Sequence, residues 1–333
     1  ELGGLMIKVG QFMSSRLDVL PPEITDELEG LQDEVPSVPF AVIKALAEAE
    51  LGFPLERAFA SFDPVPIAAA SLGQAHRATL TPAFAAESGV ETVVVKVQRP
   101  SIDEIVAVDL LALRKVGVWL SRVKLVSKRV DAPALVEEFA ATSLQEIDYP
   151  HEGASAERFA ADFAALPDGA GDRILVPEVI WERTTRRVLT LTDVTAIKVN
   201  DVESLVSVGI DPKAVADELA RATFQQVFVS GFFHADPHPG NLFVTPRAAP
   251  DGSPDFALTF IDFGMMGEIS PELRAGLRET IIAAVARDGK GLVTAMHRLG
   301  VLLPSANTGE LEPAPIEEAI GLLRGVAAAG SVS

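Results

Sequence analysis

The sequence predicts an α+β protein with two lobes, a small β-sheet lobe and a mainly helical lobe, behind a helical N-terminal extension. Three segments of different composition support this prediction. Residues 1–60 show helical periodicity, residues 61–195 hold short β-branched runs with helices inserted between them, and residues 196–333 are mostly helical again. Since a small sheet against a helical lobe leaves a cleft between them, we expect the function to reside there.

Composition limits the function classes. The 333 residues include no cysteine, which excludes disulfides, thiolate zinc sites and cysteine nucleophiles. The formal net charge of −19 repels nucleic acid and anionic headgroups unless a local basic patch overrides it, so we expect no nucleic-acid partner. The densest basic run, four cations in residues 122–129, is interpreted as a solvated helix end.

The chain contains no run of about 20 apolar residues that could form a membrane helix, and no signal peptide. It does not start with Met, and both ends look cropped. We therefore expect a longer parent protein, in which a membrane anchor is not excluded. The Ala-, Pro- and Arg-rich composition suggests a GC-rich genome, bacterial or algal.

The extension and the sheet lobe are predicted element by element. Helices are expected at 5–21, 22–36 and 39–52, with the first ending at a Pro-Pro pair. Residues 63–80 predict a strand, a tight loop and a second strand, and residues 91–100 a third strand. Further helices are predicted at 101–123, 132–148 and 150–166, the first with Ser101 and Glu104 at capping-box spacing. Two more strands are expected at 176–184 and 186–194.

The helical lobe is predicted from its start signals. Asp211-Pro212 and Ser270-Pro271 each combine a cap with a first-turn proline, so each begins a helix. Between these helices, residues 241–244 and 256–264 are expected to form a hairpin around a Pro/Gly/Asp-rich loop at 245–255. The tail is expected to be helical with a break near 304–314.

Three polar residues around this hairpin predict a phosphate-transfer site. Asp262 ends a strand in "FIDFG", where a carboxylate can hold Mg²⁺, although the triplet alone is more often a simple strand end. Asp236 and Asn241 have the five-residue spacing of the protein-kinase motif H-R-D-x-x-x-x-N. We predict that Asn241 and Asp262 bind metal and that Asp236 is the candidate base.

The same loop, "FFHADPHPGN", contains His234 and His238. A zinc or iron site is the alternative, but the chain has only five histidines and none elsewhere at ligand spacing. We expect His234 to orient the loop from a partly buried position, and the residues assign no role to His238.

Lys96 lies inside the apolar strand "VVVKV", where an ammonium group is costly unless it meets anions. The V-A-I-K lysine of kinases contacts nucleotide phosphates. The alternative is an edge-strand lysine that faces water.

Residues 67–74, "IAAASLGQ", occupy the place of a Gly-rich phosphate loop. Because alanines replace glycines, this loop should be stiff; its predicted nucleotide-binding residues are Ala68, Ala69, Ala70, Ser71 and Gly73.

Two further polar sets are each, in isolation, solvated helix faces. Lys8 and Gln11 of "KVGQ" are three residues apart on one helix face. Glu146 and Asp148 lie near a helix end, and Glu152 follows them.

Together these motifs resemble the UbiB (AarF/ADCK) family of atypical kinases, within the protein-kinase-like superfamily. The resemblance extends from residue 1 to about residue 300, in order. It implies a bilobal protein-kinase-like fold, a K-x-G-Q helix over the active site, and gating by Lys8 and Gln11, with Lys8 paired to Glu146 or Asp148. Glu152 would be the helix partner of Lys96.

The family resemblance also implies cofactors and partners. Members bind ATP with Mg²⁺, show ATPase activity, associate with membranes, and support isoprenoid-quinone biosynthesis or lipid homeostasis in bacteria, plastids and mitochondria. Expected partners are therefore a nucleotide, an isoprenoid lipid or quinone precursor, a membrane surface and other biosynthetic proteins. The expected location is the cytoplasmic face of a bacterial membrane, or alternatively a plastid or mitochondrion.

Two sequence features bear on the phosphoryl acceptor and on which nucleotide base is bound. Past Asp262 the chain passes almost directly into the helix at Ser270, so a peptide-docking activation segment is missing. Leu191 and Asp193 occupy the expected adenine hinge, where relatives often have an acidic residue and an aromatic one, so base preference is open.

We predict an ATP-dependent atypical kinase or ATPase. The alternatives are a true protein kinase and a non-catalytic, ATP-switched lipid-binding scaffold.

Overall fold

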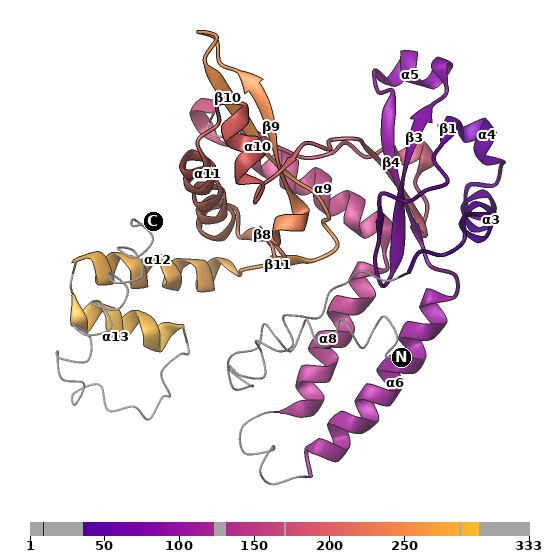
Figure 1. Cartoon of the computed structure of the whole chain (residues 1–333). Coiled ribbons are helices and arrows are strands. Elements are labelled where there is room, and N and C mark those ends of the chain that lie inside the picture. The colour runs from indigo at the N-terminus through magenta and orange to yellow at the C-terminus, as the bar shows by residue number, and fades with distance from the viewer. Residues whose placement is uncertain (1–8, 10–35, 123–130, 170, 287, 300–333) are drawn as a thin grey trace. The chain divides into compact units, whose positions relative to one another are not determined.

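The computed structural model describes residue 9 and residues 36–122, 131–169, 171–286 and 288–299 (Figure 1). The chain forms two compact units: Glu1–Ala216 with Ala235–Met266, and Asp217–His234 with Gly267–Ser333. The predicted α+β class is confirmed, because helices alternate with two mainly antiparallel sheets and a short strand pair. The division at residues 60 and 195 stays a prediction.

The first sheet belongs to the first unit and has the order β1-β3-β4-β6, with β2 paired to β3. Its strands are β1 (Phe59–Phe62), β2 (Ala68–Ala69), β3 (Gly73–Leu80), β4 (Thr92–Gln98) and β6 (Val188–Thr192). Alternation along β4 buries Val93, Val95 and Val97 completely and leaves Lys96 facing the other way. The valines pack on α3 (Phe40–Leu51) and α4 (Leu55–Ala58), which cover this face.

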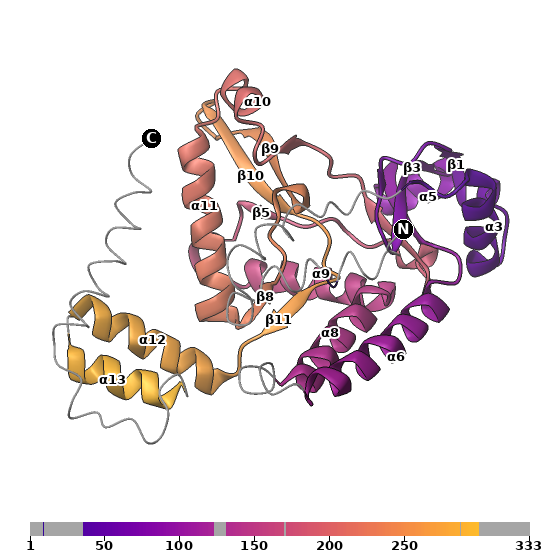
Figure 2. The ribbon, with the colours of Figure 1, turned by 60° about the horizontal axis from the view of Figure 1, so that its bottom comes forward.

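Among the described residues, four α-helices lie in the connections between strands of this sheet. They are α5 (Pro82–Ser88), α6 (Ile102–Leu120), α8 (Ala132–Glu146) and α9 (Tyr149–Ala164). Figures 1 and 2 show α6 and α8 side by side. The helix after Ser101 is as predicted, but the capping box is wrong. Ser101 has a left-handed backbone (φ 56°), and its side chain caps nothing.

Two strand predictions are corrected. The strand expected at 176–184 is a single bridge from Val179 to Leu191, followed by the 3₁₀ turn η2 (Trp181–Arg183). Pro177 lacks the N–H that a ladder needs, and the turn ends the pairing. The first strand begins at Phe59, earlier than expected, and the alanine-rich stretch contributes only the two residues of β2.

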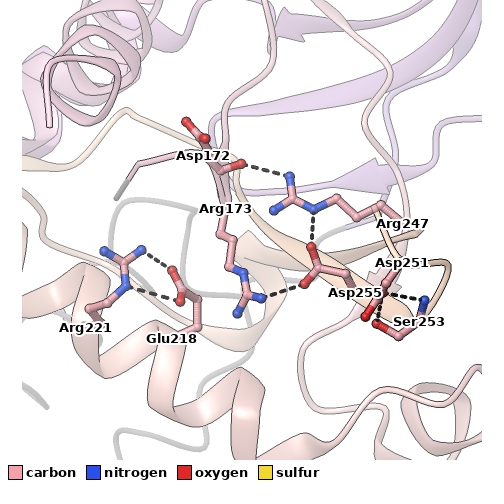
Figure 3. Close-up of polar contacts among 8 residues, drawn as sticks. All are labelled: Asp172, Arg173, Glu218, Arg221, Arg247, Asp251, Ser253 and Asp255. Atoms are coloured by element: carbon pink, nitrogen blue, oxygen red, sulfur yellow. Dashed lines mark hydrogen bonds and ion pairs between the residues drawn. The ribbon is translucent and has the colours of Figure 1, made fainter. Parts of the chain in front are cut away.

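The second sheet, also in the first unit, has the order β5-β10-β9-β7: β5 (Ile174–Leu175), β10 (Pro254–Phe260), β9 (Leu242–Ala248) and β7 (Ile197–Lys198). The predicted hairpin is present, and its strands extend into the expected loop. Figure 3 shows Asp255 between Arg173 (2.8 Å) and Arg247 (3.0 Å), which ties β10 to its neighbours. Burial acts to raise the pKa of Asp255. The hydrogen bond from the Phe256 backbone and the two guanidinium groups outweigh this effect, so the pKa is lowered.

The short helix α10 (Val202–Ser207) precedes α11 (Pro212–Gln225), which enters the second unit. There it continues as the π-helical turn η3 (Gln226–Ser230), and an Arg221–Glu218 ion pair supports it (Figure 3). The strand β8 (Phe232–His234) pairs with β11 (Met266–Glu268).

In the described part of the second unit, two further helices follow: α12 (Pro271–Ala286) and α13 (Gly289–Arg298). The Ser270 cap is confirmed, because its Oγ accepts the Leu273 N–H at 3.2 Å. None of the helices in the described ranges is both long enough and apolar enough to cross a bilayer.

Candidate active site

Lys96 and Glu152 form the buried centre of the site. The Lys96 Nζ lies 2.5 Å from Glu152 Oε1, and the side chains are 20% and 4% exposed. The Glu152 carboxylate comes from the first turn of α9, which begins after Asp148; the Asp148 side chain accepts the His151 N–H as an N-cap. The cap therefore sets the start of α9 so that Glu152 faces β4.

A second carboxylate, that of Asp262, reaches the same lysine. Its Oδ2 lies 3.5 Å from Lys96 Nζ, and its side chain is 48% exposed. Burial alone would lower the pKa of Lys96, but the Asp262 and Glu152 carboxylates raise it above its ordinary value. Burial raises the pKa of Glu152, Lys96 opposes this, and Asp262 adds to it. The lysine therefore stays charged, and two carboxylates share one cation.

The β9–β10 hairpin brings Asn241 close to Asp262. Leu242 pairs with Phe260, and the Ile261 N–H donates to the Asn241 carbonyl at 3.0 Å. Asp262 then leaves the strand with a left-handed backbone (φ 63°), and its Oδ1 accepts the Gly264 N–H at 3.3 Å. A non-glycine residue in this region is uncommon and often marks a functional site.

The predicted loop residues lie beside this hairpin. Asn241 Nδ2 donates to the carbonyl oxygen of Asp236 at 3.1 Å and to its Oδ2 at 3.2 Å. The side chains of Asp236 and Asn241, five residues apart in the sequence, are therefore in direct contact. His238 caps the turn η4 (Pro239–Asn241) by accepting the Gly240 N–H at 3.0 Å, which gives it a structural role. His234 is buried in the second unit, where its N–H donates to Gln226.

The residues present fit magnesium. Asp262 and Asn241 offer only oxygen donors, which Mg²⁺ prefers, and Mg²⁺ usually completes its shell with phosphate oxygens and water. Among the described residues, no three His, Asp or Glu side chains converge on one point, so a closed all-protein cage is not formed there.

The alanine-rich loop is fixed by several hydrogen bonds. The Ala70 N–H donates to the Gly73 carbonyl at 2.8 Å and closes a tight turn. Arg99 holds the turn from β4's end: its Nε donates to the Ala70 carbonyl at 2.9 Å and its backbone N–H to the Leu72 carbonyl at 2.9 Å. Ala68 and Ala69 form β2, and Ser71 is buried. The backbone at these five predicted positions is thus held in one conformation.

Tyr149 is a site residue that the sequence reasoning missed. It is buried at the start of α9, and burial raises the pKa of its phenol, with Lys96, Glu152 and Asp262 close enough to influence it. Its hydroxyl lies 2.6 Å from where a Cβ on Gly73 would be. Gly73 is therefore required by packing as well as by loop flexibility. The available signal was the three-residue spacing from Glu152, which puts both on one helix face.

The predicted hinge residues lie at the end of β6. Leu191 is buried and pairs with Val94. Asp193 is engaged within the protein: it accepts from Arg77 Nε at 3.1 Å and the Thr195 N–H at 2.9 Å, and its own N–H donates to Thr92. Adenine binding by these two residues remains a prediction.

Of the four predicted gating residues, the structure describes two, Glu146 and Asp148. Glu146 ends α8 beside Gly264, two residues after Asp262, because a Cβ on Gly264 would lie 3.8 Å from Glu146 Cα. Asp148 is the α9 cap. Lys8 and Gln11 lie outside the described residues, so their predicted pairing with Glu146 or Asp148 remains a prediction.

Comparison with known proteins gives concordant similarities. Residues 30–296 match the ABC1 atypical kinase-like domain. The chain is 42% identical over 313 residues to Protein ACTIVITY OF BC1 COMPLEX KINASE 8, chloroplastic, of Arabidopsis thaliana; the match covers 93% of this chain and 38% of that protein. It is 36% identical to a probable protein kinase UbiB of Xanthomonas euvesicatoria, over 94% and 55% of the two chains. The chain thus spans about half or less of these relatives.

One solved structure is also similar. This is Rv3197 of Mycobacterium tuberculosis in complex with erythromycin, with a TM-score of 0.59 and 28% identity. The match covers 89% of this chain and 69% of that one.

Proposed function

The chain belongs to the family of ABC1 atypical kinase-like domains, and from this premise we propose that it binds Mg-ATP and acts as an atypical kinase or ATPase. This membership confirms the UbiB-type resemblance and the kinase-like fold that the motifs predicted. In the proposal, the chain supports isoprenoid-quinone biosynthesis of the ubiquinone type, or membrane lipid homeostasis. The chloroplastic and bacterial relatives support those compartments, and the proposal places the chain at a membrane surface.

The observation that carries the proposal is the cluster of Lys96, Glu152 and Asp262. A buried lysine held at 2.5 Å by one carboxylate and approached at 3.5 Å by a second is already charged and oriented. The Asp262 carboxylate is half exposed and lies 3.5 Å from this cation. A divalent cation with a nucleotide phosphate satisfies both the exposed carboxylate and the lysine.

Each residue then has a distinct role. Lys96, oriented by Glu152, binds phosphate oxygens, while Asp262 and Asn241 would hold Mg²⁺. The bound ion supplies neutralisation of the charge that develops on the transferring phosphoryl group. Asp236, fixed by Asn241 at 3.2 Å, is positioned to accept a proton from the attacking hydroxyl or water.

The test measures Mg²⁺-dependent ATP turnover for the parent chain, Asp262→Asn and Lys8→Ala, with and without membranes and quinone precursors. We expect turnover in the parent and its loss in Asp262→Asn. No turnover and no nucleotide binding in the parent would refute the enzyme assignment. Protein phosphorylation that rises in Lys8→Ala would favour a gated protein kinase instead.

A further inference from the structure

The outward face of α6 carries large apolar side chains in water. The helix buries Ile102, Val106, Leu110 and Gly117 on one face. On the opposite face Trp119 is 62% exposed and Leu111 57% exposed, with Val108 and Val118 beside them. A soluble helix normally leaves that face polar, so contiguous exposed apolar side chains indicate an interaction surface.

The residues of this face surround a hollow. Its volume is about 420 Å³, and it is lined by Leu111, Arg114, Lys115, Val118, Trp119 and Arg122. The spacing of three and four residues places these side chains on one side of the helix. We call this set, with Val108, the α6 face.

The charge of this region is opposite to that of the whole chain. Residues 111–130 contain six of the 28 lysines and arginines and none of the 47 acidic residues, in a chain of net charge −19. Arg114 is bound by Glu137 of α8 through two hydrogen bonds of 2.7 and 2.8 Å. Lys115 and Arg122 form no ion pair with any residue that the structure describes. The ammonium group of Lys115 and the guanidinium group of Arg122, both exposed, can therefore meet external anions.

We propose that the α6 face docks the chain on an anionic lipid bilayer. Trp119, Leu111 and Val118 enter the headgroup–acyl boundary, and Lys115 and Arg122 meet anionic headgroups. The assignment deepens the proposed function by naming the surface that contacts the membrane. A second copy of the face would set cations against cations, and a nucleic acid would leave the apolar residues in water.

Tryptophan fluorescence provides a direct test, because the chain has only two tryptophans. In Trp181→Phe the sole emitter is Trp119. We expect its emission to shift to the blue with vesicles of phosphatidylcholine and phosphatidylglycerol, to shift far less with phosphatidylcholine alone, and to revert as salt is raised. In Trp119→Phe, the remaining Trp181 should show no shift.

Charge reversal tests the electrostatic part. The variant Lys115→Glu/Arg122→Glu should partition onto the anionic vesicles about tenfold more weakly or worse. The matched control, Lys198→Glu/Lys290→Glu, makes the same change in net charge at exposed sites elsewhere and should bind like the parent.

Three results would overturn the proposal: an unmoved Trp119 emission, equal weakening by both charge-reversal variants, or equally tight binding of heparin without a spectral shift. The last result would assign the face to a soluble polyanion. Mg-ATP binding measured without vesicles should be the same in all these variants. Its absence in the parent would refute the proposed function and leave the vesicle result standing.

Discussion

The two halves of the site differ in how completely they are assembled. In the lysine half, the partly buried Lys96 and the buried Glu152 are joined at 2.5 Å, with the buried Tyr149 beside them. In the metal half, Asp262 is 48% exposed on a left-handed backbone, and the Asn241 side chain donates to the exposed Asp236. The Lys96–Glu152 pair is thus largely shielded from solvent, whereas the Asp262 carboxylate is half exposed. In our proposal, folding builds the first half and a ligand completes the second.

The largest expected effect is on activity, in the metal half. Asp262→Asn should reduce Mg²⁺-dependent turnover by about 100-fold or more, because an amide oxygen binds Mg²⁺ more weakly than a carboxylate does and brings no negative charge to the ion. Asn tolerates the left-handed conformation, so the melting temperature should stay within a few degrees of the parent's. Loss of activity accompanied by a large fall in melting temperature would contradict a purely ligand role.

The next effect is on stability, in the lysine half. Glu152→Gln should lower the free energy of unfolding by about 3 kcal/mol, because it leaves the buried Lys96 with only the longer contact to Asp262. Asn241→Ala is the matched change in the metal half and should cost less than about 1 kcal/mol. Urea denaturation measures both. Equal costs would show that the two halves do not differ in assembly.

Gly73 and Tyr149 test the packing behind the lysine. Gly73→Ala should destabilise the protein by about 1–3 kcal/mol, because the added methyl group would meet the Tyr149 hydroxyl at 2.6 Å and the Val97 carbonyl at 2.8 Å. Tyr149→Phe removes only the first clash. In a double-mutant cycle it should therefore recover part of the loss. Strict additivity of the two changes would place the tyrosine away from Gly73.

The smallest effect is a pH dependence at the far side of the first sheet. His76 is fully buried: its Nδ1 is 2.7 Å from the Asp63 carbonyl, and its Nε2 is 2.8 Å from the Gln74 amide. Burial lowers the pKa of His76, although the Asp63 contacts oppose it.

The unfolded chain thus binds the His76 proton first, so stability is constant above about pH 6.5 and falls as the solution is acidified below it. The slope for one proton is at most about 1.4 kcal/mol per pH unit. The variant His76→Gln should lack this component in thermal unfolding between pH 7.5 and 5.5. Superimposable pH profiles for parent and variant would contradict this assignment.

Much of the site followed from spacing, because Asn241 and Asp262 flank the two strands of one hairpin and Asp236 lies in the short loop before it. The five-residue interval predicted that Asp236 and Asn241 belong to one site, without predicting the side-chain contact that the structure contains, and the hairpin that brings Asn241 to Asp262 was expected. The roles of these residues in binding Mg-ATP are still predictions.

What the sequence could not supply depends on side chains that meet across the fold. Tyr149 gives no local signal of its contact with Gly73, and Arg99 looked like an ordinary residue after a strand. The capping box failed at Ser101 because its backbone turns left-handed to redirect the chain out of β4. The strand at 176–184 failed because β-propensity does not register that only Val179 reaches a neighbouring strand.

Arg99 has one more consequence. The Arg99 guanidinium donates to the Ala70 carbonyl through Nε and to the Pro36 carbonyl through Nη2, the second at 2.9 Å. The alanine-rich loop and the chain entering from the N-terminal extension are therefore fastened to a single planar group. A displacement of residue 36 by even one ångström would have to be absorbed by that group or passed on to the turn beneath it. The Arg99 side chain thus couples the position of residue 36 to that of the alanine-rich loop.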